Sequence, residues 1–245
     1  IWMIKKNRDV VIVDPGDSSP VLSLLKKEGF NLKGILITHK HADHIGGIED
    51  LIKFYPDVKI YGPKNEFNFT YDLVSNNDLI TINELGISFR VIETPGHTLD
   101  HIVFADKNHL FCGDTLFGCG CGKLFEGTFS QMHTSLKLLS KLPGSIKIFC
   151  AHEYTKKNIE FALMLEKDNE DLFARKKNLK NVDITMIVYA LILLIIQVFI
   201  ATTRWQYVLK CQKIMLDYKN TLQILWSGLF FNQAMPSSVG GDVIR

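Results

Sequence analysis

Short apolar runs alternate with polar or amphipathic segments over the first two thirds of the chain. Apolar residues 1–4 and 10–13 flank the charged residues 5–9 and predict a β-hairpin. Amphipathic segments with apolar residues three and four apart predict helices at 20–28, 45–54, 155–165 and 168–180. Further apolar runs predict strands at 35–38, 58–61, 79–82, 87–92, 109–112 and 146–150. The alternation of the two patterns predicts an α/β fold in which helices cover sheets.

The pattern changes abruptly at residue 182. Residues 184–203 are almost wholly apolar and carry no charge, with Gln197 as the one strongly polar interruption. About 20 apolar residues span a bilayer core, so this segment predicts a membrane helix; a buried core helix is the alternative. A second apolar stretch follows at 222–231. Because cations lie on both sides of the first stretch, the charges leave its orientation open.

Composition narrows the function classes. The chain has 245 residues, of which 47% are hydrophobic, and a formal net charge of +2. No long basic run accompanies stacking aromatics, so a nucleic-acid partner is not expected. The five cysteines form no C-x-x-C pair, which argues against a zinc ribbon or a disulfide framework and favours a reducing compartment. The opening apolar run is too short for a signal peptide.

Four candidate metal ligands lie within one short loop after the predicted strand 35–38. His39 and His41 are two residues apart, so in extended backbone they point the same way. Asp43 and His44 are adjacent and diverge from that pair. Four ligands in one loop predict two nearby ions. The alternative is a solvated polar loop with fortuitous histidines.

Three more candidate ligands follow predicted strands. His97 comes after a Pro-Gly turn, Asp114 ends the strand run at 109–112, and His152 follows the run at 146–150. Strand ends that meet at one edge of a sheet bring such side chains together, so the pattern predicts a single metal centre there. The neighbouring Cys112 is predicted to be a small core residue.

Five motifs now point to a family. In chain order they are H-x-H-x-D-H, P-G-H-T, C-G-D-T-L-F, G-C-G-K-L-F-E-G-T and A-H-E-Y-T. Through these motifs, residues 1 to about 180 resemble proteins of the metallo-β-lactamase fold. In detail they resemble glyoxalase II, the hydroxyacylglutathione hydrolases. The resemblance implies an αββα sandwich with two divalent metal ions, usually zinc and sometimes iron or manganese. It implies that the first ion is held by His39, His41 and His97, and the second by Asp43, His44 and His152, with Asp114 bridging both.

The resemblance also implies the reaction, hydrolysis of S-D-lactoylglutathione to D-lactate and glutathione in methylglyoxal detoxification. A metal-bridging hydroxide would attack the thioester, with Asp43 and Asp114 as the catalytic residues. Lys123 and Tyr154 match positions that contact glutathione, and Phe125 stands where some relatives have a tyrosine. Since glutathione thioesters are cytosolic, the catalytic part is predicted to be cytoplasmic and the C-terminal segment membrane-embedded.

The predicted domains are a catalytic domain at 1–152, the start of a truncated helical substrate domain at 153–181, and a membrane segment at 182–245. The last segment, above all residues 231–245, resembles the lysylphosphatidylglycerol synthase transmembrane region, a flippase-like membrane family. Two alternatives stay open: another metallo-β-lactamase-fold thioesterase or persulfide dioxygenase, and an inactive fusion fragment of a membrane protein. The dioxygenase uses one iron and fewer ligands, so the seven candidate ligands weigh against it.

Overall fold

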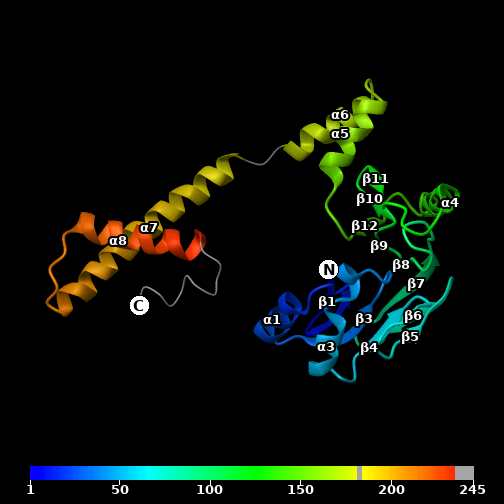
Figure 1. Cartoon of the computed structure of the whole chain (residues 1–245), viewed down its shortest axis with the longest axis horizontal. Coiled ribbons are helices and arrows are strands. Elements are labelled where there is room, and N and C mark those ends of the chain that lie inside the picture. Colours follow the sequence, from blue (N-terminus) through cyan, green and yellow to red (C-terminus); the bar gives the residue numbers. More distant parts are fainter. Residues whose placement is uncertain (181–183, 235–245) are drawn as a thin grey trace. The chain divides into compact units, whose positions relative to one another are not determined.

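The computed structural model describes the backbone of residues 1–180 and 184–234 (Figure 1). The chain divides into two compact units, Ile1–Lys176 and Lys177–Arg245, and each is described by itself. The predicted domain boundary at 181/182 and the motif at 235–245 lie outside the described residues.

The first unit contains two five-stranded sheets. The first sheet has the order β1-β2-β3-β4-β5, in which only the β1–β2 hairpin is antiparallel. Its strands are β1 (Trp2–Lys6), β2 (Asp9–Val13), β3 (Asn31–Leu36), β4 (Lys59–Gly62) and β5 (Asp72–Leu73). The predicted hairpin is therefore confirmed. Helices α1 (Ser18–Glu28) and α3 (Ile48–Phe54) provide the crossovers that parallel strands require.

The second sheet has the order β12-β9-β8-β7-β6, in which only β12 and β9 are parallel. Its strands are β6 (Leu79–Ile82), β7 (Ile87–Glu93), β8 (Ile102–Ala105), β9 (His109–Gly113) and β12 (Lys147–Cys150). A two-stranded ribbon joins β10 (Leu116–Phe117) to β11 (Gly120–Cys121). The remaining helices of this part are α4 (Phe129–Leu139), α5 (Thr155–Leu165) and α6 (Glu170–Lys180).

Three apolar clusters hold the layers together. The central cluster joins the facing sides of the two sheets, with Val11 from the first and Phe89 and Phe104 from the second. A second cluster packs the other side of the first sheet against α1 and α3, and a third packs the second sheet against α4. Phe89 and Phe104 are fully buried, and burying such a side chain contributes about 2 kcal/mol. The predicted αββα sandwich is thereby confirmed.

Two predicted elements have wrong boundaries. The helix predicted at 45–54 is two helices, α2 (Ala42–Ile45) and α3, which are separated at Gly46 and Gly47. A side chain at Gly47 would lie 2.5 Å from the Ser18 nitrogen and 2.6 Å from the Pro15 oxygen, so only glycine lets the chain pass here. The strand predicted at 35–38 starts four residues earlier and ends at Leu36, which leaves His39 in a loop.

The second unit is a helical hairpin of α7 (Ile184–Cys211) and α8 (Tyr218–Ala234). The side chain of Gln206 donates to the Leu216 carbonyl, and the Tyr218 hydroxyl donates to the Phe199 carbonyl. Within α7, residues 191–211 are long and apolar enough to cross a membrane, and few of their side chains are buried. The helix thus contains the predicted span at 184–203 and continues eight residues beyond it.

Candidate metal centre

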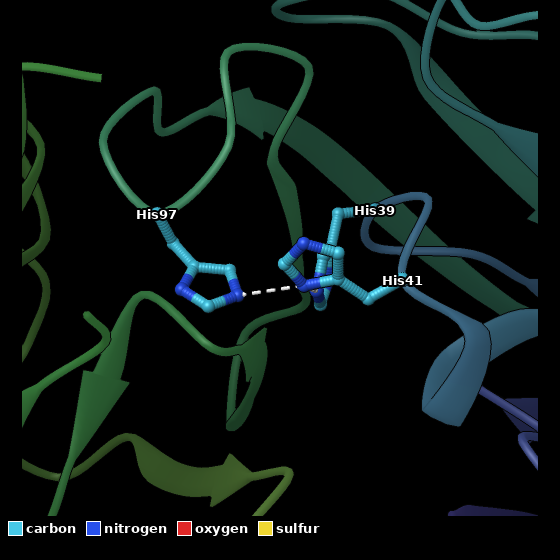
Figure 2. Close-up of side chains that lie close together, drawn as sticks. All are labelled: His39, His41 and His97. Atoms are coloured by element: carbon cyan, nitrogen blue, oxygen red, sulfur yellow. Dashed lines mark hydrogen bonds between the residues drawn. The ribbon is translucent and has the colours of Figure 1, made fainter. Parts of the chain in front are cut away.

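Three imidazoles from two loops converge at the edge of the sandwich. His39 and His41 lie in the loop after β3, and His97 lies in the loop between β7 and β8. Figure 2 shows the three side chains pointing toward one another. The Nδ1 atom of His41 is 3.0 Å from Nε2 of His39 and 3.0 Å from Nε2 of His97. Three nitrogens at this spacing can share one cation.

A second group lies beside the first. His44 comes from α2, Asp43 precedes it, and His152 follows β12. The Nε2 atom of His152 is 3.2 Å from Oδ2 of Asp43, and Nε2 of His44 is 3.8 Å from the same oxygen. His44 is buried, whereas Asp43 is exposed and His152 is half-buried, so this group opens toward solvent.

The carboxylate of Asp114, directly after β9, lies between the two groups. Its Oδ2 atom is 3.4 Å from Nε2 of His97 in the first group. Its Oδ1 atom is 3.4 Å from Nε2 of His44 and 3.5 Å from Nε2 of His152 in the second. Each oxygen thus faces a different group, which is the arrangement that a ligand shared by two ions requires. The structure therefore brings all seven sequence-predicted ligands into one centre.

Hydrogen bonds on the outer side of three imidazoles fix which nitrogen faces the centre. Nδ1 of His97 donates to the carbonyl of Lys123 at 2.7 Å, and Nδ1 of His44 contacts Oδ2 of Asp14 at 2.9 Å. Nδ1 of His39 lies 3.1 Å from the Thr38 hydroxyl. Because the outer nitrogen is occupied, Nε2 of each ring faces the centre, as in histidines that bind metals.

The electrostatics of the centre suit a cation. Burial strongly lowers the pKa of His39, reinforced by the neighbouring imidazoles, and burial also lowers the pKa of His97. Burial alone would lower the pKa of His44, but the carboxylates of Asp114 and Asp14 outweigh it and raise the value to about 10. Burial would raise the pKa of Asp114, but the surrounding histidines, above all His44, lower it.

The fit of a metal ion rests on two buried atoms. Among the described residues, Nε2 of His44 and Oδ1 of Asp114 are buried without a hydrogen-bond partner. Burying such groups unpaired costs about 1–3 kcal/mol each, and a cation between them would remove that cost. A set of nitrogens and carboxylate oxygens suits zinc and also iron or manganese.

Two residues that support the centre were not predicted from the sequence. Asp14 directly follows β2 and is buried, so the strand-end rule applied to the seven ligands would also have found it. His101 is fully buried, and its Nε2 accepts a hydrogen bond from the backbone N–H of Asp114 at 3.1 Å. Burial, with smaller contributions from the neighbouring histidines, lowers the pKa of His101 to about 3. Since that nitrogen is occupied, His101 holds the Asp114 backbone in place.

Gly113 allows this part of the chain to approach the ligand loop. Its φ of +47° lies in the left-handed region, which favours glycine. A side chain here would lie 2.5 Å from the Thr38 hydroxyl and 2.8 Å from Nε2 of His101. Glycine at this position therefore lets Asp114 reach the centre.

The three sequence-predicted substrate contacts surround the centre. The ring of Phe125 meets those of His41 and His97 edge to face, at centroid distances of 5.1 and 5.2 Å. The amine of Lys123 lies 5.0 Å from the Phe125 ring. Tyr154 stacks on His152 at 5.4 Å. All three side chains are exposed, so they can meet a molecule that enters from solvent.

Comparison with known proteins agrees with this geometry. Residues 1–152 match the family model of the metallo-beta-lactamase superfamily. The chain is 43% identical over 178 residues to the hydroxyacylglutathione hydrolase of Methylobacillus flagellatus, which covers 72% of this chain and 71% of that protein. It is 47% identical over 174 residues to the hydroxyacylglutathione hydrolase of Photobacterium profundum, covering 70% and 68%. The chain belongs to the hydroxyacylglutathione hydrolase family.

The chain also matches a solved structure and a second family model. The crystal structure of ETHE1 from Myxococcus xanthus superimposes with a TM-score of 0.55 and 29% identity, covering 62% of this chain and 69% of that one. Residues 161–245 match the family model of the lysylphosphatidylglycerol synthase TM region. Both resemblances seen in the sequence are therefore confirmed, whereas the predicted boundaries of the three domains stay predictions.

Proposed function

We propose that the chain hydrolyses a hydroxyacylglutathione thioester, with S-D-lactoylglutathione as the substrate, at a centre of two divalent metal ions. The observation that carries the proposal is the position of Asp114, whose two carboxylate oxygens face two separate groups of candidate ligands. The relatives named hydroxyacylglutathione hydrolase, at 43–47% identity, support the substrate class.

The proposed ligands follow the two groups. The first ion would be held by His39, His41 and His97, the second by Asp43, His44 and His152, and Asp114 would bridge them. Zinc is the proposed metal, and the same nitrogen and oxygen donors accept iron or manganese. Bound divalent ions supply Lewis acidity, which activates water as a nucleophile at neutral pH and polarises a carbonyl group.

The side chains of the chain itself position the reactants. Buried His39 and His44 close the inner side of the centre, while exposed Asp43 and half-buried His152 leave the outer side open for substrate. The carboxylates of Asp43 and Asp114 can accept hydrogen bonds from the attacking water and so orient its oxygen toward the thioester carbon. The water passes a proton to the Asp43 carboxylate as the C–O bond forms, and the C–S bond then breaks. The sulfur leaves as a thiolate, which is stable enough to depart without a dedicated acid.

We assign the glutathione part of the substrate to the exposed side chains around the centre. The amine of Lys123 would pair with a carboxylate, and the hydroxyl of Tyr154 would bond to a peptide group. Phe125 offers a ring face in place of a hydroxyl, so one hydrogen bond is lost relative to a tyrosine at this position. Weaker binding that leaves the chemical step intact raises KM more than it lowers kcat.

The second unit is proposed to tether this enzyme to a membrane, with the catalytic unit in the cytoplasm. The support is one helix, α7, that is long and apolar enough to span a bilayer, together with the match of residues 161–245 to a membrane family. The tether has a test of its own. Flotation of the purified chain with lipid vesicles, beside a chain that ends at residue 176, provides one.

The activity test uses the full chain in detergent, loaded with zinc, and follows loss of the thioester absorbance of S-D-lactoylglutathione. His97→Ala removes a proposed ligand, and His133→Ala, an exposed histidine on α4, is the matched control. We expect two zinc ions per chain, hydrolysis by the wild type and the control, and loss of activity in His97→Ala. Two bound ions without hydrolysis would refute the substrate. A wild type that binds no zinc would refute the centre.

A further inference from the structure

Residues 123–127 run alongside the loop that carries His97. The backbone N–H of Phe125 donates to the His97 carbonyl at 3.0 Å, and that of Gly127 donates to the Gly96 carbonyl at 3.1 Å. The His97 ring in turn donates to the Lys123 carbonyl. The segment is therefore bonded both to the backbone of the His97 loop and to the ring of His97.

One side chain of this segment also reaches the other ligand loop. Oε2 of Glu126 accepts a hydrogen bond from the backbone N–H of Leu99 at 3.0 Å, and Oε1 pairs with Nζ of Lys40 at 2.5 Å. Lys40 stands between His39 and His41, and Leu99 lies two residues after His97. A single carboxylate thus joins the two loops that carry the first group of ligands.

Within the first group, His41 is the ligand that most needs such a restraint. The rings of His39, His44 and His97 each have an outer nitrogen in a hydrogen bond. The hydrogen bonds of the His41 ring, within the described part of the chain, use only the Nδ1 atom that faces the centre. Its position therefore depends on the backbone of its loop and on the Phe125 ring that packs against it.

We propose that Glu126 is a positioning residue that sets the metal affinity of the site formed by His39, His41 and His97. The inference rests on the proposed two-metal function. Glu126 acts by holding Lys40 and Leu99 at a fixed separation, which keeps His41 at the right distance from His97. Among the described residues, Glu126 forms no hydrogen bond or ion pair with the other site, formed by Asp43, His44 and His152, so that site should keep its affinity.

The test measures two zinc binding constants of the full chain by titration against a chromophoric chelator. His41→Ala and His152→Ala identify which constant belongs to which site. Outer hydrogen bonds around metal ligands change affinity by 10–100-fold. Because both Lys40 and Glu126 are partly exposed, we expect the lower end: about tenfold weaker binding at the first site for Glu126→Ala, and no change at the second.

Further variants separate the two contacts. The amide oxygen of Glu126→Gln can still accept from the Leu99 N–H but has lost the ion pair, so we expect a loss of about threefold, since exposed ion pairs contribute little. Lys40→Met should match it, and the two changes combined should not add. Glu160→Gln, which removes the ion pair between Glu160 on α5 and Lys176 on α6, is the matched control and should change neither constant.

Each outcome decides the matter. Selective loss at the first site, in the order Ala beyond Gln, supports the proposal. Wild-type constants in Glu126→Ala, or equal losses at both sites, overturn it while leaving the two-metal centre standing. If the wild type binds no zinc, both the proposed two-metal function and the role of Glu126 are overturned. If circular dichroism shows that Glu126→Ala does not fold, Glu126→Gln and Lys40→Met take its place. Selective loss of zinc affinity at the first site in these variants supports the proposal, and its absence overturns it.

Discussion

Asp14 offers the sharpest test of how the outer hydrogen bonds prepare the centre. Its buried carboxylate accepts three bonds: from the Thr38 N–H at 2.8 Å, from the Thr38 hydroxyl at 2.7 Å and from Nδ1 of His44 at 2.9 Å. We consider Asp14→Asn, which keeps the shape of the side chain. Asp14 has a φ of +50°, and asparagine tolerates this left-handed conformation, so no backbone penalty confounds the result.

The magnitude follows from the geometry. The amide oxygen must stay on the Thr38 N–H, because the reverse orientation would set two donors against each other. The amide nitrogen then faces His44 Nδ1, which must accept, so the ring is neutral and its one proton lies on Nε2 and points into the centre. Hydrogen bonds to charged groups are worth about 1.5–3 kcal/mol. Two are lost and one neutral bond, worth about 1 kcal/mol, is regained, so we expect a loss of about 2–5 kcal/mol in unfolding free energy.

The same change of tautomer should weaken metal binding at the site of His44 by 10–100-fold. Guanidinium unfolding of the metal-free chain and zinc titration against a chelator measure the two effects. Asp50→Asn, which alters an exposed carboxylate paired with Lys53 on α3, is the matched control. If Asp14→Asn binds both zinc ions as tightly as the control, Asp14 does not orient His44 and the tautomer argument is wrong.

Four further outcomes are expected. Gly113→Ala should lower the unfolding free energy by more than ~1 kcal/mol, because it adds a close contact to a left-handed φ; an unchanged guanidinium midpoint would contradict this. His101→Leu should cost about 2–4 kcal/mol by leaving buried polar partners unpaired, measured in the same way. Burial would raise the pKa of Asp106, but hydrogen bonds from His109 and neighbouring N–H groups lower it below the ordinary 3.8. Its folded-state pKa is depressed, so its stabilisation is present above pH 3.8 and is lost as the pH falls further; the stability gap between wild type and Asp106→Asn should close in acid. Burial raises the pKa of Cys112 to about 12, so a thiol reagent at pH 8 should label it only after unfolding.

The ligand loop could be predicted from the sequence because its chemistry is local. His39, His41, Asp43 and His44 lie within six positions, and the apolar run before them marks a buried strand. The predicted limits of the strand were wrong by a few residues, but the prediction of the site did not depend on them. The ligands lie in the loop after the buried strand, whichever residue ends that strand. The helix break at Gly47 was missed because it depends on contact with Pro15 and Ser18, far away in the sequence.

The supporting residues could not be predicted in the same way, because their roles depend on which segments become neighbours. Asp14 supports His44 only because β2 and β3 lie side by side and parallel, which brings their ends to one edge. Glu126 reaches Lys40 only because residues 123–127 run along the His97 loop. Strand β8, which follows His101, was missed as a run of only four residues after a polar turn.

The two kinds of support have different consequences for the centre. Asp114 and His152 follow β9 and β12, which are parallel neighbours, so the ladder between these two strands sets the backbone just before each residue. His41 lies on a loop and is held through Glu126 and Phe125 at the surface. Changes at Glu126 or Phe125 should therefore alter the affinity of the first metal site before that of the second. On the exposed rim, Phe125 is thus coupled to the site of His39, His41 and His97, whereas Tyr154, which stacks on His152, is coupled to the other site.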